Sequence, residues 1–150
     1  QVRSMGRVSR GVQGIRLRPG DEVVDLVIAE PNSSLLTICE NGYGKRTPIE
    51  EYRPQNRGGL GLINMKTTER NGKVVALKTV HDDDELMLIT ANGMMIRTGL
   101  EQVREIGRNT AGVRMITLKE GDKLVAAARL ASENGQESES EGSEQASEDE

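Results

Sequence analysis

The sequence predicts an all-β fold made of repeated four-stranded blades, as in a propeller. The first observation is that the chain aligns with itself at offsets of 50 and 51 residues. The second is that its apolar runs are short and rich in β-branched and aliphatic residues, while no segment before residue 123 has a long helical period. The third is an Asn-Gly pair between two apolar runs in each of two successive units, which is typical of a hairpin.

The internal repeat is clearest in three segments that fall in register, MGRVSRGVQGIRL, QNRGGLGLINMKT and IGRNTAGVRMITL. Gly11, Gly61 and Gly112 coincide in this alignment. Three sets of apolar residues coincide as well: Val2 with Tyr52 and Val103, Val12 with Leu62 and Val113, and Ile15 with Met65 and Ile116. We expect these sets to face one core, because a single blade cannot bury both faces of its sheet without neighbours.

The first unit gives four predicted strands, near residues 12–17, 23–29, 34–39 and 43–47. A Pro-Gly turn at 19–20 separates the first two, and Asn41-Gly42 predicts a tight hairpin in which both central residues have positive φ. The second unit repeats the pattern through VVALKTV and LMLIT, and the third ends after KLVAAARLA at 123–131. The alanines of that last segment favour a helix locally, but it aligns with VVDLVIAE in the repeat, and we therefore predict a strand.

The two ends of the chain differ from the repeats. The start, Gln1-Val2-Arg3, has no initiator methionine, which suggests a piece of a longer protein. Residues 132–150 contain almost no apolar side chain, and we predict a disordered acidic tail there. Such a tail either occupies the basic surface of the repeats or only keeps the chain in solution, and both interpretations stay open.

Charge is distributed unevenly along the chain. The formal net charge is −4, but eight of the 24 acidic residues lie between Glu133 and Glu150, where there is no basic residue. The preceding part has 20 basic and 16 acidic residues, a net charge of +4. A mildly basic body with an acidic tail is the pattern of a protein that binds a polyanion.

The composition excludes several kinds of chemistry. Cys39 is the only cysteine and His81 the only histidine, so neither an internal disulfide nor a zinc site of Cys and His ligands is possible. No apolar run has the length of a membrane span or follows a basic start as in a signal peptide, so a cytoplasmic protein is expected.

Catalytic and metal sites are not expected either. Tyr43 and Tyr52 occupy packing positions of the repeat, and the acidic run Asp82 to Glu85 between two strands predicts a solvated loop at a blade tip in preference to a Mg²⁺ site. His81 begins that loop and has no partner acid in the repeat pattern. We therefore predict no catalytic residue and no metal site in this chain.

Arginines recur at fixed positions of the repeat. One position holds Arg3, Arg53 and Arg104, another holds Arg7, Arg57 and Arg108, and a third holds Arg46 and Arg97. Because the rotation from blade to blade carries an equivalent side chain round the rim, we expect a curved row of positive charge, which suits a curved polyanion. With neighbouring groups, the predicted phosphate-binding residues are Arg3, Arg7, Arg10, Lys45, Arg46, Arg53, Arg57, Gly58, Gly59, Arg97, Arg104 and Arg108.

The loop QNRGGLG, residues 55–61, lies in the same segment as these arginines. In one interpretation its glycines leave backbone N–H groups uncovered, so that they hold a phosphate together with Arg57. In the other the glycines only permit turns between blades, which is what an isolated glycine-rich signal usually means. The recurrence of the arginines favours the phosphate.

These motifs resemble a known family, the C-terminal domain of the DNA gyrase A subunit. The resemblance covers about residues 1–131 and is carried by GRVSRGVQGIRL, NGYGKRTPIEEYR, RGGLGL and GRNTAGVRMITL, which recur in order. It implies a six-bladed β-pinwheel that wraps DNA, of which residues 1–131 would be the last two to three blades. QNRGGLG is similar to the family's gyrase box, Gln-Arg-Arg-Gly-Gly-Lys-Gly, but has Asn56 for an arginine and Leu60 for a lysine. The main wrapping determinant is therefore expected upstream of Gln1.

The resemblance also implies a function. DNA gyrase is a type II topoisomerase that introduces negative supercoils using ATP, and the implied partners are double-stranded DNA, a gyrase B subunit, and a second A subunit in an A2B2 holoenzyme. ATP and Mg²⁺ would be used through other regions, with no cofactor in this chain, and the implied location is the bacterial cytoplasm, associated with the nucleoid. Two alternatives remain: the related domain of the A subunit of topoisomerase IV, and a propeller fragment that binds an acidic protein surface.

Overall fold

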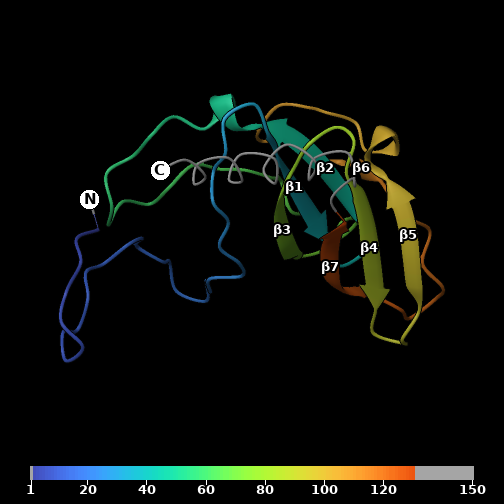
Figure 1. Ribbon diagram of the computed structural model, residues 1–150. Helices are drawn as coiled ribbons and strands as arrows, with labels where there is room; N and C mark the ends of the chain where they lie inside the picture. Colours follow the sequence, from blue (N-terminus) through green and yellow to red (C-terminus); the bar gives the residue numbers. More distant parts are fainter. Residues whose placement is uncertain (1, 131–150) are drawn as a thin grey trace, which may run out of the picture.

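The computed structural model describes residues 2–130, and these form an all-β structure (Figure 1), as the sequence predicts. The seven strands are β1 (Ser34–Cys39), β2 (Tyr43–Pro48), β3 (Val74–Val80), β4 (Glu85–Thr90), β5 (Met95–Gly99), β6 (Val113–Arg114) and β7 (Leu124–Leu130). Two short 3₁₀ helices, η1 (Ile49–Glu51) and η2 (Leu100–Gln102), follow β2 and β5. The predicted acidic tail, residues 132–150, lies outside the described residues.

The strands form two antiparallel sheets that lie side by side (Figure 1). One has four strands in the order β3-β1-β2-β6, and the other has three in the order β5-β4-β7. The core between them includes Leu36, Ile38, Leu86 and Leu88, all with 0% exposure. Burial alternates along β4, whereas every residue of β1 is buried, and removing this apolar surface from water stabilises both sheets.

Each sheet combines strands from successive repeats, a feature that the sequence leaves open. β1 and β2 belong to the first unit, but β3, from the second unit, pairs with β1, and β6, from the third, pairs with β2. In the same way β7, from the third unit, pairs with β4 of the second. The repeats are therefore held to one another by backbone hydrogen bonds as well as by side-chain packing.

Two predicted strands of the first unit are wrong. Residues 23–29 form no strand, and the segment 12–17 contributes only an isolated bridge between Ile15 and Gly59. The equivalent of 23–29 in the second unit is β3, whose partner β1 comes from the unit before it. No described residues form an equivalent strand before the first unit, so the segment 23–29 has apolar side chains but no partner strand. The remaining strand predictions are confirmed by β1, β2, β3, β4 and β7.

The strand β7 shows tertiary pairing overriding local preference. Its alanines favour a helix in isolation, yet residues Leu124–Leu130 pair along their length with β4, from Glu85↔Leu130 to Thr90↔Leu124. Leu124 is 1% exposed and joins the main core. The position of this segment in the repeat is thus a better guide to its structure than its composition.

The two Asn-Gly hairpins have a different turn from the one predicted. Only the glycines, Gly42 with φ 83° and Gly93 with φ 81°, have positive φ. The N–H of Gly42 donates to the carbonyl of Cys39 at 3.2 Å, and that of Gly93 donates to Thr90 at 3.0 Å. This is the arrangement of a three-residue loop with a glycine in the left-handed region. The register shifts at the ends of β1 and β4 lie in their pairings with β3 and β7, not in the hairpins.

Cys39, predicted to be a small buried hydrophobic residue, has 0% exposure at the end of β1 and packs with Tyr43 and Met65. Burial raises the pKa of its thiol to about 11. None of the helices among the described residues is long or apolar enough to cross a membrane.

We expect the Cys39 thiol to resist alkylation at pH 8 until the protein unfolds. Because the thiolate is the reactive species, raising the pKa from 9.0 to about 11 lowers the reactive fraction by about a hundredfold, before steric protection is counted. Iodoacetamide labelling followed by mass spectrometry, with and without urea, measures this difference. Equal rates in the two conditions would show that Cys39 is not held inside the core.

Candidate nucleic-acid interface

The arginine-bearing loops are attached to the preceding repeat by equivalent backbone hydrogen bonds. In the loop 55–61, the N–H of Gly58 donates to the carbonyl of Gly14 at 2.6 Å, and Gly59 accepts from the N–H of Arg16 at 2.8 Å. In the third unit, Asn109 donates to Asn64 at 2.8 Å and Thr110 accepts from Lys66 at 2.9 Å. Successive loops are thus presented in the same way, with parallel bridges Ile15↔Gly59 and Met65↔Thr110.

The N–H of Gly58, in the glycine-rich loop, donates a hydrogen bond within the protein. This N–H is therefore not open to an anion, which contradicts the predicted role of this amide. The residue has φ 74°, and its equivalent Asn109 has φ 55°, so this position requires a left-handed backbone. Gly58 is therefore explained by the turn. Gly59 is exposed, and its carbonyl accepts the hydrogen bond that joins the loop to the first unit.

The recurring arginines of the first two sets lie on these loops and beside them. Exposed members are Arg3, Arg7, Arg53, Arg57 and Arg104, together with the neighbouring Arg10. Arg108 is half-buried, with its Cζ 5.9 Å from the centre of the Tyr52 ring and its Nη1 donating to the carbonyl of Ile63 at 3.3 Å. The segment 59–65, which joins the two bridges, spans at most about 22 Å, so the loops carrying Arg57 and Arg108 are neighbours.

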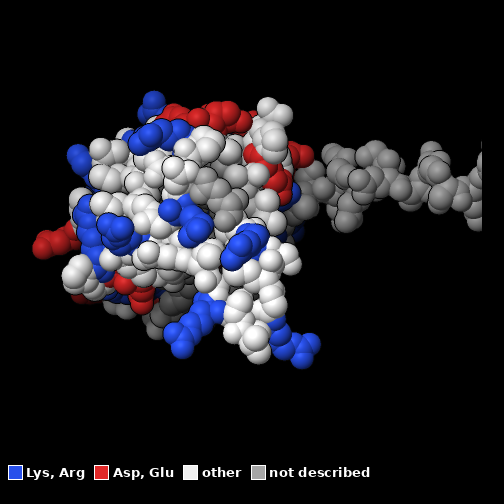
Figure 2. Space-filling view, turned by 90° about the vertical axis from the view of Figure 1, so that its left-hand side faces the viewer, with Lys and Arg blue, Asp and Glu red and all other residues white. Residues whose placement is uncertain are grey.

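Figure 2 shows the face that contains the N-terminal segment and the neighbouring loop of Figure 1. Lys and Arg side chains spread across the middle of this face, whereas Asp and Glu side chains lie chiefly near its edges (Figure 2). A surface with this distribution attracts a polyanion to its centre.

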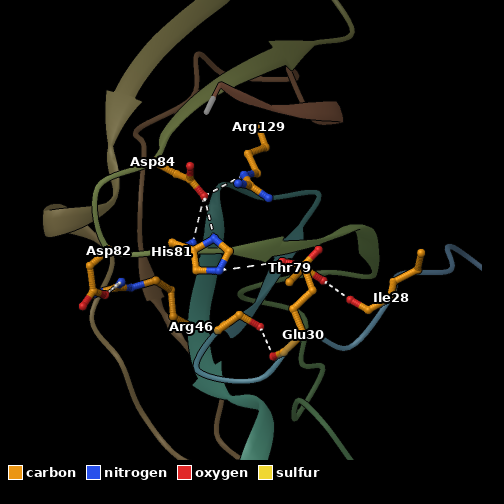
Figure 3. Close-up of polar contacts among 9 residues, drawn as sticks. Ile28, Glu30, Arg46, Thr79, His81, Asp82, Asp84 and Arg129 are labelled. Carbon is orange, nitrogen blue, oxygen red and sulfur yellow. Dashed lines mark hydrogen bonds and ion pairs between the residues drawn. The ribbon is translucent and has the colours of Figure 1, made fainter. Parts of the chain in front are cut away.

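The two arginines of the third recurring set form ion pairs within the chain. Arg46 is 12% exposed; its Nε donates to the carbonyl of Val103 at 2.8 Å and its Nη1 forms an ion pair with Asp82 at 2.6 Å (Figure 3). Arg97 forms an ion pair with Glu85, with Nε at 2.8 Å from the carboxylate. Both guanidinium groups thus stabilise contacts between strands or units, and neither offers an uncompensated charge.

Lys45, which the sequence placed among the phosphate-binding residues, is fully buried. Its Nζ donates to the carbonyls of Asn64 and Gly107, both at 2.8 Å, and to the hydroxyl of Thr110 at 3.2 Å. Burial lowers the pKa of this amine below its ordinary value. The alignment contains a signal for this position, because Lys45 aligns with Ile96, an apolar residue.

The Lys45 contacts belong to a polar network that joins all three units. Tyr52 Oη donates to Asn64 Oδ1 at 2.6 Å, and Asn64 Nδ2 donates to the hydroxyl of Thr37 at 2.8 Å. The hydroxyl of Thr47 donates to the carbonyl of Ile106 at 2.8 Å. This network fixes the loop that carries Arg108 against β1 and β2, and it gives Tyr52 a structural role, in agreement with its predicted packing position.

The acidic loop after β3 is less solvated than predicted. Asp84 is 3% exposed and accepts a hydrogen bond from the backbone N–H of His81 at 2.8 Å (Figure 3). It also forms an ion pair with Arg129 Nε at 2.7 Å. His81 lies between two carboxylates, 3.8 Å from Asp84 and 3.7 Å from Glu30, so the absence of a partner acid inferred from the repeat pattern was wrong. The cluster joins the first unit, the β3–β4 loop and β7.

Two arginines that do not recur in the repeat, Arg70 and Arg114, contact the ring of Tyr43. Arg114 aligns with Gln13 and Ile63, so no periodic signal marks it. Its place beside Tyr43 follows from the pairing of β6 with β2, in which Tyr43 is opposite Arg114. Among residues 2–130, no group of three His, Cys, Asp or Glu side chains is placed to hold a metal ion.

Comparisons with known proteins agree with this geometry. The family model described as DNA gyrase C-terminal domain, beta-propeller, matches residues 1–30, 33–81 and 84–131. The chain is 46% identical over 140 residues to the A subunit of DNA gyrase from Neisseria gonorrhoeae, covering 90% of this chain and 15% of that protein. It is 44% identical over 133 residues to the A subunit of DNA gyrase from Chlamydia pneumoniae, covering 88% and 16%. The chain thus spans about 15% of the length of such relatives.

Solved structures give the same result. A structure of a DNA gyrase A C-terminal domain superimposes with a TM-score of 0.79 at 32% identity, covering 87% of this chain and 44% of that one. The C-terminal domain of a DNA topoisomerase IV gives a TM-score of 0.58 at 32% identity, covering 69% and 31%. On the agreement of sequence, repeat structure and these matches, the chain belongs to the DNA gyrase C-terminal domain, beta-propeller family.

Proposed function

We propose that this chain is the DNA-binding C-terminal part of the A subunit of a gyrase, and that it binds duplex DNA through phosphate contacts, without base specificity. The observation that carries the proposal is the presentation of exposed arginines on loops that equivalent hydrogen bonds hold in successive repeats. The proposed contacts are Arg3, Arg7, Arg10, Arg53, Arg57, Arg104 and Arg108, with Gly59 beside them. Lys45, Arg46, Gly58 and Arg97 are left out, because their donors or charges are used within the protein.

The physical basis is counterion release. Each phosphate that a protein neutralises contributes about 0.9 to the slope of log affinity against log salt concentration. Bending a 20–30 base-pair site by 40–90° costs on the order of 1–6 kcal/mol, so wrapping needs many such contacts along the path. A row of arginines over two to three repeats supports weak binding by itself and extends a wrap that other repeats contribute to.

In the whole enzyme, this binding would assist ATP-dependent negative supercoiling by a type II topoisomerase in the cytoplasm. A gyrase B subunit, together with a second A subunit, would complete the A2B2 assembly, and ATP and Mg²⁺ would act through regions outside this chain. The name of the relatives supports gyrase, and the higher TM-score to a gyrase domain than to a topoisomerase IV domain agrees with that choice.

Replacing Arg53 and Arg104 together by glutamine is expected to lower the affinity for a labelled 30 base-pair duplex about tenfold at low salt and the salt slope by about 1.8. Both side chains are exposed, and within residues 2–130 neither lies within ion-pair distance of a carboxylate. Fluorescence anisotropy over a salt series, with two duplexes of unrelated sequence, measures affinity and base specificity together.

The matched control is Lys73→Gln/Lys123→Gln, which removes the same amount of positive charge. Both lysines are exposed and interact electrostatically with Glu40. This control is expected to change the slope by much less. A wild-type chain that shows no affinity for duplex at low salt, or an affinity insensitive to salt, would contradict the proposed function. Salt-sensitive binding to an acidic protein without binding to DNA would favour the protein-interaction alternative.

A further inference from the structure

Two arginines from different repeats meet one tyrosine at the beginning of β2. The Cζ of Arg70 lies 4.9 Å from the centre of the Tyr43 ring, and the Cζ of Arg114 lies 5.5 Å from it. Nη2 of Arg114 also donates to the Tyr43 hydroxyl at 2.9 Å. We propose that these three residues, the Tyr43 cluster, bind one phosphate of the DNA backbone as a contact separate from the recurring arginines. This inference rests on the DNA binding proposed above.

The backbone around the Tyr43 cluster is fixed by contacts among three repeats. Tyr43, from the first unit, is 7% exposed and lies opposite Arg114 of the third unit in the β2–β6 pairing. The amide of Asn41 donates to the carbonyl of Arg70 at 3.3 Å, which ties the second unit to the β1–β2 hairpin. Asn71, with 0% exposure, donates to Ala111 at 3.0 Å. Both guanidinium groups therefore extend from a preorganised backbone, which reduces the entropy lost on binding.

The two guanidinium groups of the cluster form no ion pair within the described part of the chain. Both Arg70 and Arg114 are exposed. Asp122 lines the same pocket, and its carboxylate accepts hydrogen bonds from the backbone of Asn92 at 3.1 Å and of Lys123 at 2.9 Å and forms no ion pair with either arginine. Two cations held near one ring repel each other, and an anion between them would remove that repulsion.

A pocket of about 370 Å³ opens beside these side chains. Its wall includes Tyr43, Arg70 and Arg114, with Thr117 and Leu118 on the third unit. Guanidinium groups present several N–H donors in a planar fork that matches phosphate oxygens, and a tyrosine ring orients such groups through its face. The geometry therefore favours a phosphate over an apolar ligand.

The location separates this contact from the arginine row. Tyr43 begins β2, whereas the loop carrying Arg104 and Arg108 joins β2 near its other end, where Ile106 donates to the carbonyl of Arg46 at 2.9 Å. Tyr43 and Arg46 are three residues apart on β2, about 10 Å along the strand, so the two places are expected to contact different phosphates. The Tyr43 cluster would thus extend the DNA footprint along the blade.

The test is the double variant Arg70→Gln/Arg114→Gln, compared with the wild-type 150-residue chain by anisotropy with the same duplex. Loss of one phosphate contact is expected to lower the salt slope by about 0.9 and the affinity about fivefold at low salt. The control Lys73→Gln/Lys123→Gln removes an equal charge from two lysines that follow Arg70 and Arg114 in the sequence and interact with Glu40. A slope that falls in the first variant and not in the control would support the inference.

Three results would overturn it. If the wild-type chain binds duplex and both double variants behave alike, the Tyr43 cluster makes no contact, while the proposed function stands. If the wild-type chain does not bind duplex, both proposals fail. If the side-chain Nε–H signals of Arg70 and Arg114 in NMR spectra shift with inorganic phosphate but not with duplex, the cluster holds free phosphate and not the DNA backbone.

Discussion

Lys45→Ala is expected to lower the free energy of unfolding by about 3 kcal/mol or more, the largest effect of any single side chain outside the apolar core. The ammonium group is fully buried and donates to Asn64, Gly107 and Thr110, which lie in two later repeats. Alanine would remove three hydrogen bonds from a charged donor, and such a bond is worth about 1.5–3 kcal/mol. The carbonyls of Asn64 and Gly107 keep the bonds that they accept from Asn109 and Thr110. The substitution would also leave a cavity where the aliphatic stem lies.

Urea unfolding of Lys45→Ala, Lys45→Met and the control Lys73→Ala would separate these causes. Methionine keeps most of the stem, so its effect should be smaller than that of alanine but still well above the control, which is expected to stay within about 0.5 kcal/mol of wild type. If Lys45→Met were as stable as wild type, the free energy gained from the hydrogen bonds of the ammonium group would only equal the cost of removing that group from water.

The difference in stability between wild type and Lys45→Met is expected to depend on pH, and the sign of this dependence follows from the pKa of Lys45. Burial lowers the pKa of Lys45 in the folded protein below its ordinary value of 10.5. Between the folded and unfolded pKa values the unfolded chain binds more protons, so the free energy of unfolding rises with pH in the window below 10.5. Lys45→Met lacks this titration, and the stability of wild type relative to it should increase as the pH approaches 10.5.

Gly112→Ala is expected to lower the free energy of unfolding by about 3 kcal/mol. The residue has φ 73°, which costs an alanine about 1 kcal/mol. A Cβ would also lie 2.7 Å from the carbonyl oxygen of Gly44 and 2.6 Å from Cε of Met65. The Met65 side chain is able to move, but the Gly44 carbonyl belongs to β2, so the overlap shifts backbone and adds about 1–3 kcal/mol.

Gly11→Ala is the matched control for this prediction. Gly11 occupies the equivalent position of the first unit and has φ 74°, but no described atom lies within 4 Å of the place that its methyl group would take. Only the conformational cost remains, and we expect a loss of about 1 kcal/mol. Thermal or urea unfolding of the two variants measures the difference, and equal losses would show that β2 does not approach Gly112 as closely as the structure has it.

Local sequence signals were sufficient for the elements whose partners lie nearby in the chain. The β1–β2 and β4–β5 hairpins were predictable because an Asn-Gly pair between two apolar runs specifies contacts over a few residues. The repeat added β7, whose alanines point the other way, because an equivalent position in the alignment carries more information than local propensity. The same reasoning failed for residues 23–29, since a strand also needs a partner strand.

The roles of charged side chains were predicted less well, because the role of a charge depends on which groups lie next to it in the folded chain. Arg46 recurs with Arg97, yet Arg46 pairs with Asp82 of the next unit, whereas Arg97 pairs with Glu85 across the β4–β5 hairpin. Lys45 has the sequence context of a surface lysine, and only the packing of the third unit shows that it is buried. The recurring arginines of the loops, apart from the half-buried Arg108, are exposed as expected, and their function stays a proposal.

The sequence by itself determined the all-β class, the period of the repeat, the hairpins and the set of loops that carry arginine. The tertiary structure decided which strands share a sheet, which cations are neutralised and where Arg70 and Arg114 meet Tyr43, 71 residues from Arg114 in the chain. The physical reason is range: backbone conformation and apolar periodicity depend on adjacent residues, whereas burial and charge pairing depend on segments that meet only when successive repeats exchange strands.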